Sequence, residues 1–367
     1  MNKNLLVVSL FVHDMKAPLA VIGSGANKLR ADMARDGYDA AGQKLVDQIL
    51  RVKAEAAAVL NKILDMESGD DPAQESVSPR GIQAAGGRTG FAGKIRRFFP
   101  KGRERKEKKD PGERISKAVQ DLRSHLEKQL ELVQALRVQE SHAGIGRHGT
   151  SVVRRMRRNA KTALHFADNA IAILSRDESG AGAKSCRVSS VILPVMVEVF
   201  DLVDTDTSEK IRALPELARL REILGPVHVH LDLDQQQWDA DFFFNMDVIQ
   251  QVLLNLLLNA FKFRRKNIRL RIDTRGDRVV FSVVDDGKGI PEKDQDRIFK
   301  QRFQVKSDGE FPIRGHGIGL AGAQALLERI GGHLELESSP DKATCFSAVI
   351  IKQQPREIST GPQSILE

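Results

Sequence analysis

The stretch NLLLNAFKF, residues 255–263, ends an apolar helix that the residue spacing predicts over residues 248–263. Around this helix, apolar and polar residues alternate with the two-residue period of a strand. The alternating segments are VHVHLDLD (227–234), IRLRIDT (268–274), VVFSVVDD (279–286), HLELESS (333–339) and TCFSAVII (344–351). A further helix is predicted at residues 319–330. Strands mixed with segregated helices predict an α/β sandwich of the α+β class over residues 186–352.

Three segments of this region carry side chains suited to one kind of ligand. Near the end of the apolar helix, Asn259 is placed to hold a hydrated Mg²⁺ and Lys262 to meet a phosphate. DDGKGIP directly follows a predicted strand, so Asp285 is expected to face a pocket. In the same segment Gly287 and Gly289 let the backbone turn closely around a ligand.

The third segment is GHGIGLAGAQALL, residues 315–327, a glycine-rich turn that opens a helix. The free N–H groups and the helix dipole at such a turn form an anion site suited to phosphates. It is not a dinucleotide fingerprint, because no βαβ unit with an acidic residue about twenty positions later surrounds it. Each segment alone is weak evidence, and the order and spacing of all three is what is specific.

The N-terminal region has the pattern of a helical hairpin. Apolar residues recur at spacings of three and four on both sides of a break at residues 35–42. The two stripes consist of Val12, Met15, Leu19, Ile22, Ala26, Leu29 and Met33, and of Val46, Ile49, Val52, Ala56, Val59, Ile63 and Met66. Because one hairpin cannot enclose its own stripe, we expect residues 1–68 to dimerise into a four-helix bundle.

Residues 69–111 are rich in Gly, Pro, Ser and charge, which predicts a flexible linker. Its basic part, residues 93–109, is expected to be solvated, although the pair Phe98–Phe99 leaves room for attachment to an anionic membrane surface. A second, coiled-coil-like helical hairpin is predicted at residues 112–180, and residues 353–367 form a tail. The two hairpins end in the similar segments ILDMESG (63–69) and ILSRDESG (173–180), which hint at a duplication of the hairpin.

Composition excludes several classes of protein. The two cysteines lie far apart without metal-ligand spacing, which excludes a disulfide scaffold or a zinc module. Aromatic residues make up only 5% of the chain and form no visible stacking platform, so the net charge of +8 does not point to nucleic acid. The early apolar run LLVVSLFV is too short to span a bilayer. We expect a cytoplasmic chain, which could still be a fragment of a longer membrane sensor.

Residues 186–352 resemble the ATP-binding domain of the sensor histidine kinases of two-component systems, which shares the fold of the Bergerat-type (GHKL) ATPases. The resemblance implies that ATP and Mg²⁺ bind here. The N-box of that family corresponds to residues 255–263, so the implied nucleotide-binding residues are Asn255, Asn259 and Lys262, with Asn259 as the Mg²⁺ ligand.

The two glycine boxes of the family are matched as well. The first corresponds to residues 285–290, and the resemblance implies that Asp285 hydrogen-bonds the adenine amino group beside Gly287 and Gly289. The second corresponds to residues 315–320 at the hinge of a lid over the phosphates. Its implied nucleotide-binding residues are Gly315, Gly317, Gly319 and Leu320.

The first hairpin resembles the dimerisation and phosphoacceptor domain of the same family, and HDMKAPL, residues 13–19, corresponds to its H-box. His13 and Asp14 lie just off the apolar stripe, so His13 is expected to be accessible to solvent. An imidazole there could attack the γ-phosphate of ATP, with Asp14 as the orienting group and general base. Pro18 removes a backbone donor and is expected to kink the helix.

Two departures from the family pattern matter. Ala17 stands where the family often has a Thr or Asn that orients a water, so we expect weak phosphatase activity. Residues 69–185 also separate the first hairpin from the ATP-binding domain. The second hairpin is either an extra signalling bundle, with a linker that lets the domain swing back to His13, or a degenerate copy. In the second case it dimerises in its own right and leaves the first hairpin as a detached phosphate carrier.

We therefore expect a homodimeric, ATP-dependent protein-histidine kinase that phosphorylates His13 and passes the phosphoryl group to an aspartate of a response regulator receiver domain. The signal would come from the second hairpin, an upstream sensor protein or a missing N-terminal part. The alternatives are a nucleotide-binding signalling adaptor without phosphotransfer and a GHKL ATPase that couples hydrolysis to conformational change.

Overall fold

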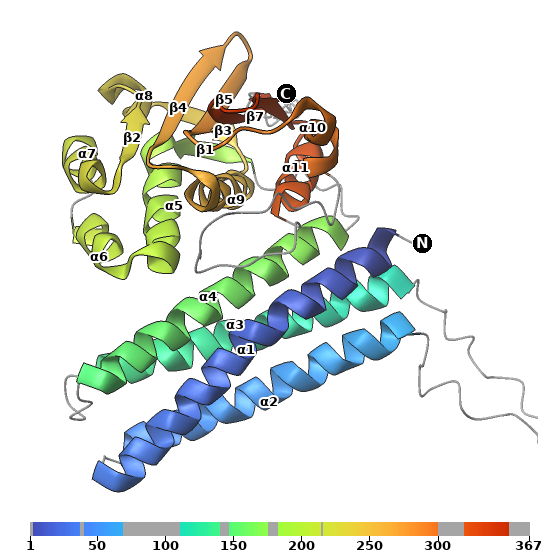
Figure 1. Ribbon diagram of the computed structural model, residues 1–367, viewed down its shortest axis with the longest axis vertical. Helices are drawn as coiled ribbons and strands as arrows, with labels where there is room; N and C mark the ends of the chain where they lie inside the picture. The colour runs from blue at the N-terminus through green and yellow to red at the C-terminus, as the bar shows by residue number, and fades with distance from the viewer. Residues whose placement is uncertain are drawn as a thin grey trace, which may run out of the picture.

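The computed structural model describes residues 3–36, 40–68, 111–139, 147–174, 183–213, 216–299 and 319–351. Four long helices form a bundle, and an α/β domain lies against it (Figure 1). The bundle helices are α1 (Lys3–Asp36), α2 (Ala40–Ser68), α3 (Pro111–Gln139) and α4 (Arg147–Leu174). The helical N-terminal region and the C-terminal α/β domain agree with the fold class predicted from the sequence.

The two hairpins pack against each other within one chain. Helix α1 contacts both α2 and α4, and α3 contacts the same two helices, so the four helices form a closed ring. The predicted apolar stripe of α1 is completely buried, with each of its residues at most 3% exposed. From the sequence, a second copy of the chain was expected to cover this stripe. The second hairpin covers it instead, because α3 and α4 carry matching apolar stripes of their own.

The α/β domain follows α4 directly. Its helices are α5 (Val188–Val203), α6 (Thr205–Ala213), α7 (Leu217–Leu224), α8 (Gln235–Asp239), α9 (Met246–Phe263), α10 (Glu292–Ile298) and α11 (Gly319–Arg329), with a 3₁₀ turn η1 (Gly225–Val227). Its strands are β1 (Lys184–Arg187), β2 (Val229–Asp232), β3 (Asp241–Phe244), β4 (Ile268–Arg275), β5 (Arg278–Asp285), β6 (His333–Glu337) and β7 (Thr344–Ile351).

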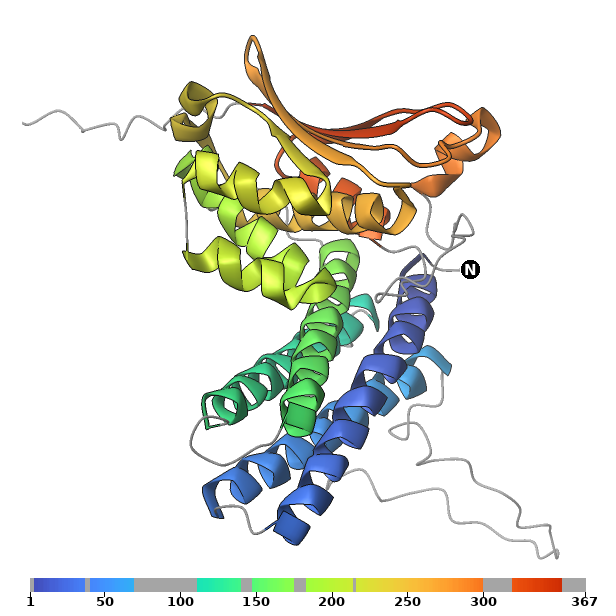
Figure 2. The same cartoon turned by 60° about the vertical axis from the view of Figure 1, so that its left-hand side comes forward.

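The main sheet has the strand order β2-β4-β5-β7-β6, in which β2 and β4 are parallel and the other neighbours antiparallel. Strand β4 alternates strictly, and its residues Ile268, Leu270 and Ile272 are buried. Helices α5, α9 and α11 form a layer between the sheet and the bundle (Figure 2). One continuous apolar core runs from the sheet through these helices into the upper part of the bundle. The domain is therefore a sandwich that shares its core with α4.

The predicted helices and strands of the domain are present within a few residues of their predicted ends. Strands β1 and β3 and helices α5–α8 and α10 were not predicted individually. Outside the described residues lie residues 69–110 of the predicted linker 69–111, residues 140–146, the glycine-rich turn with Gly315 and Gly317, and the predicted tail 353–367. None of the described helices is long and apolar enough to cross a membrane.

Candidate nucleotide site and phosphoacceptor

The end of helix α9 presents two polar side chains, Asn259 and Lys262, that form no hydrogen bond or ion pair with another described residue. Asn259 is half-buried, and its amide makes no hydrogen bond to any described residue. The Lys262 ammonium lies 5.0 Å from the centre of the Phe263 ring and pairs with no carboxylate in the described part of the chain. Burial lowers the pKa of Lys262. A desolvated cation beside an unused amide oxygen is suited to a phosphate and its hydrated metal ion.

Asp285 ends strand β5 as a buried carboxylate, 5% exposed. Its Oδ1 accepts a hydrogen bond from the Gly287 N–H at 2.9 Å. Burial raises the pKa of Asp285 to about 6, because the charged form is disfavoured away from water. The carboxylate keeps unused acceptor positions and is ionised at neutral pH. It can therefore accept a hydrogen bond from the amino group of a ligand.

Neighbouring Asp286 has the opposite environment. Its carboxylate accepts hydrogen bonds from the backbone N–H groups of Arg265, Lys266 and Asn267 at 2.8–2.9 Å. Burial raises the pKa of Asp286, but these hydrogen bonds outweigh burial and hold it below its usual range. Asp286 ties the loop after α9 to the end of β5 and so brings the Lys262 and Asp285 segments together.

The glycines after Asp285 are required by the packing of the loop itself. A Cβ on Gly287 would lie 2.6 Å from the Phe263 carbonyl oxygen. Gly289 has a positive φ of 71°, and a Cβ there would lie 1.9 Å from the Ser339 carbonyl oxygen. The predicted close approach of the backbone is thus present, but it is an approach to α9 and to the β6–β7 connection.

Asn255 takes a position that the sequence did not predict. It is 2% exposed and forms a reciprocal pair with Asn169 of α4. The Asn169 Nδ2 donates to the Asn255 Oδ1 at 3.0 Å, and the Asn255 Nδ2 donates to the Asn169 Oδ1 at 2.7 Å. Helix α11 covers the pair, since a Cβ on Gly319 would lie 3.2 Å from the Asn255 oxygen and one on Gly322 would lie 2.9 Å from the Asn169 oxygen. Asn255 therefore joins the bundle to the start of the helix after the glycine-rich turn.

His165 extends this polar contact one turn along α4. Its Nε2 lies 3.1 Å from the Asn169 Nδ2, and its Nδ1 lies 3.3 Å from the Gln251 Nε2 of α9. Burial lowers the pKa of His165 to about 4, so the ring is neutral at neutral pH. His165 therefore packs between the bundle and α9. Thr162, His165 and Asn169 follow a helical spacing of three and four, which is the sequence signal for this polar face.

A second contact between bundle and domain is ionic. Asp201 of α5 has a fully buried side chain that accepts hydrogen bonds from Arg157 at 3.1 Å and from Lys161 at 2.5 Å, both on α4. Arg212 of α6 and the Ser208 hydroxyl complete the set at 2.5 and 2.7 Å. Burial raises the pKa of Asp201, but these partners outweigh burial and hold it below its usual range. The carboxylate is therefore charged and fixes α5 on α4.

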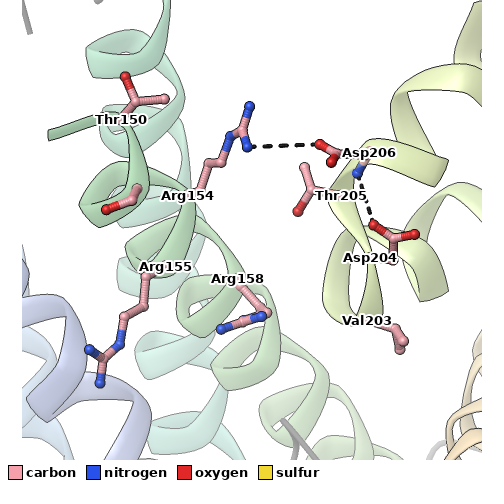
Figure 3. Close-up of a pocket in the computed structure, with 9 residues that line it drawn as sticks. Thr150, Arg154, Arg155, Arg158, Val203, Asp204, Thr205 and Asp206 are labelled. Atoms are coloured by element: carbon pink, nitrogen blue, oxygen red, sulfur yellow. Dashed lines mark hydrogen bonds and ion pairs between the residues drawn. The ribbon is translucent and has the colours of Figure 1, made fainter. Parts of the chain in front are cut away.

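A pocket of about 570 Å³ lies beside this contact and away from the predicted nucleotide residues. It is lined by α4 residues that include Arg154, Arg155 and Arg158, and by the turn between α5 and α6 (Figure 3). Arg154 crosses the pocket to Asp206 at 3.8 Å. The pocket thus separates the bundle from the domain at a point where one exposed ion pair bridges them.

The predicted phosphoacceptor His13 lies in the third turn of α1, at the end of the helix that faces the α/β domain (Figure 1). Its side chain is 67% exposed, as predicted, whereas the Asp14 side chain is buried. The His13 Nδ1 lies 3.9 Å from the Asp14 Oδ1, which is longer than a hydrogen bond. Ala17 is exposed one turn further along, and α1 continues through Pro18.

Part of the chain is similar to known proteins. Residues 245–354 match the family of histidine kinase-, DNA gyrase B- and HSP90-like ATPases. The circadian input-output histidine kinase CikA of Synechococcus elongatus is 34% identical over 148 residues, which are 40% of this chain and 19% of that protein. The aerobic respiration control sensor protein ArcB of Escherichia coli is 40% identical over 106 residues, 28% of this chain and 14% of that protein.

The adaptive-response sensory kinase SasA of Rippkaea orientalis is 32% identical over 133 residues, 35% of this chain and 34% of that protein. Among solved structures, the Acinetobacter baumannii histidine kinase AdeS aligns with a TM-score of 0.38 and 15% identity over 61% of this chain and 95% of that chain. Full-length ShkA in complex with AMPPNP aligns with a TM-score of 0.42 and 18% identity over 66% of this chain and 47% of that chain.

Residues 245–354 are thus similar to the ATP-binding domains of histidine kinases and related ATPases. The resemblance to sensor histidine kinases that the motifs predicted is confirmed. This chain spans about a third or less of the length of the three curated relatives described above.

Proposed function

We propose that this protein is an ATP-dependent protein-histidine kinase of a two-component system, with His13 as its phosphoacceptor. The observation that carries the proposal is an exposed imidazole at the end of a helical bundle against which an ATP-binding domain of the histidine kinase type is packed in the same chain. A solvated imidazole is a nucleophile at neutral pH when one ring nitrogen is unprotonated.

In the ATP-binding domain, Asp285 would accept a hydrogen bond from the adenine amino group, and Lys262 would contact a phosphate. Asn259 fits a hydrated Mg²⁺, because its amide oxygen is a hard ligand without a hydrogen bond to another described residue. The ion, when bound, would neutralise charge on the β- and γ-phosphates. Gly319 and Leu320 begin α11 beside Asn255, and Gly315 and Gly317 are proposed to hold the phosphates from the turn before it.

The chemical step then uses the first hairpin. The His13 Nε2 lone pair attacks the γ-phosphorus, the bond from that phosphorus to the bridging oxygen breaks, and ADP leaves. The ring proton on Nδ1 is lost to Asp14 or to water. Because Asp14 Oδ1 lies 3.9 Å away on the Nδ1 side, a small rotation of the His13 ring would close the orienting hydrogen bond. The phosphoryl group would then pass to an aspartate of a response regulator receiver domain.

Incubation with γ-labelled ATP tests the proposal. We expect acid-labile, base-stable label on the native chain, its loss in His13→Ala, and its retention in the control His333→Ala, which removes an exposed histidine on β6. Added receiver domain should take label from the chain. Nucleotide binding without label would favour a signalling adaptor, and phosphate release without label would favour an ATPase, so either result would overturn the kinase.

A further inference from the structure

The two hairpins are related by a constant shift in sequence. Helix α2 begins at residue 40 and α4 at residue 147, which is 107 residues later. The same shift of 107 superimposes buried core positions throughout both hairpins. The matched pairs include Val12 with Val119, Met15 with Leu122, Leu19 with Leu126, Leu29 with Leu136, Val46 with Val153 and Ala56 with Ala163. One shift that holds over both helices indicates a duplicated hairpin.

The shift also aligns the H-box HDMKAPL, residues 13–19, with QDLRSHL, residues 120–126. The acidic second residue, the basic fourth residue and the final leucine are kept, but Gln120 stands at the position of His13. Like His13, Gln120 is exposed. A carboxamide nitrogen is not a nucleophile, because its lone pair is delocalised, so the second hairpin cannot accept a phosphoryl group at this position.

The packing of the hairpins has the symmetry expected of two related halves. Helix α1 packs on α4, where a Cβ on Gly25 would lie 2.7 Å from the Met156 Cγ. Helix α2 packs on α3, where the His125 Nε2 lies 3.8 Å from the Glu55 Oε2. In an isologous dimer these two contacts would be made between chains.

The described side chains of α1 and α2, from Val8 onward, leave no large apolar residue exposed for a second chain. In the part of the chain that the structure describes, the only large exposed apolar residues are Val138 and Ile351, and neither lies on α1 or α2. The ATP-binding domain is attached to the other half, since α4 leads directly into it and fixes it through Asn169 and through the Asp201 ion pairs. The phosphoacceptor and the ATP-binding domain thus belong to different halves of one bundle.

We propose that this chain is a fused pseudo-dimer that acts as a monomer, in which the second hairpin replaces the second chain and the ATP-binding domain phosphorylates His13 across the bundle of the same molecule. The half with Gln120 is a scaffold without a phosphoacceptor. This inference rests on the proposed function for the transfer step, whereas the monomeric assembly rests on packing alone.

Two measurements on the full chain test the proposal. Light scattering should give a particle of 40.7 kDa at micromolar concentration, and the first-order rate constant of autophosphorylation should not change over a hundredfold range of protein concentration. A mixture of His13→Ala, which has an intact ATP site, with Asp285→Asn, which has an intact His13, should take up no label. A particle of twice the mass, or label on the Asp285→Asn chain of the mixture, would overturn the pseudo-dimer.

Two sets of control variants separate the test of the monomeric assembly from the test of phosphoryl transfer. Gln120→Ala should retain the labelling rate of the native chain within about twofold, and a tenfold loss would contradict a scaffold role. Gly25→Ala should lower the melting temperature by forcing the Met156 side chain aside, and adding Met156→Ala should recover part of that loss. Additive effects in this pair would contradict α1–α4 packing within one chain. If the native chain takes no label, the proposed kinase fails, while mass and melting temperature still decide the pseudo-dimer.

Discussion

Asp285 allows a test of the candidate nucleotide site. Burial of its carboxylate should destabilise the folded protein, although the same carboxylate is proposed to bind the nucleotide. Burial raises its pKa from the usual 3.8 to about 6. A carboxyl whose pKa is raised by folding destabilises the protein above that pKa, because the unfolded chain releases the proton more easily. The penalty is absent below pH 3.8 and complete above pH 6. A shift of this size corresponds to about 3 kcal/mol at pH 7.5, from about 1.4 kcal/mol for each pH unit.

Asp285→Asn removes the charge and keeps an oxygen that accepts the Gly287 N–H. Without nucleotide, we expect the free energy of unfolding to rise by about 3 kcal/mol at pH 7.5 and by about 1.6 kcal/mol at pH 5, where the native carboxyl is largely protonated. Urea denaturation at both pH values measures the gain. Binding of a fluorescent ATP analogue to the variant should be lost. The NH2 group of the new Asn side chain would face the adenine amino group, and both groups are hydrogen-bond donors.

Asp286→Asn is the matched control, since its carboxylate accepts three backbone N–H groups and has a lowered pKa. A lowered carboxyl pKa stabilises the fold above the unfolded pKa, so this variant should be less stable than the native chain at pH 7.5. A raised pKa of Asp285 would be contradicted if Asp285→Asn were no more stable than the native chain, or if its gain were equal at pH 7.5 and pH 5.

Three further predictions concern other parts of the chain. His165 is neutral in the folded protein, so the stability present above pH 6.5 should fall as the pH drops toward 4. At pH 4.5, urea titrations should show that the native chain has lost about 2.5 kcal/mol more of its free energy of unfolding than His165→Gln. Gly289→Ala should cost about 2 kcal/mol or more in thermal unfolding, since the backbone has a positive φ and the new methyl group meets the Ser339 oxygen. Ala17→Thr should speed dephosphorylation of a phosphorylated receiver domain with ADP present, and an unchanged rate beside rapid native turnover would contradict the weak phosphatase activity expected from Ala17.

Residues of the candidate site could be predicted from the sequence where they lie in one short segment. Asp285 and its glycines follow directly from a strand end, and Asn259 and Lys262 follow from the end of an apolar helix, so local pattern places them. Asn255 was assigned to the nucleotide by the same motif, yet its amide is paired with Asn169, 86 residues earlier in the chain. No local pattern reports a pair between a bundle helix and α9, because each partner is an ordinary polar residue in its own helix.

The long helices and the strands of the main sheet could be predicted from the sequence, since periodicities of 3.6 and 2 residues show which face of each element is apolar. The sequence also indicated the ATP-binding family, through the order of three short segments. Which apolar stripes of the bundle helices pack against each other is known from the tertiary structure alone. The hydrophobic effect is non-directional and proportional to the area buried, so any apolar stripe can pack against any other. The stripe of α1 therefore predicts that this face is buried, but it does not predict which helix covers it. In the fold, α1 packs on α2 and on α4, so the second hairpin completes the bundle within one chain.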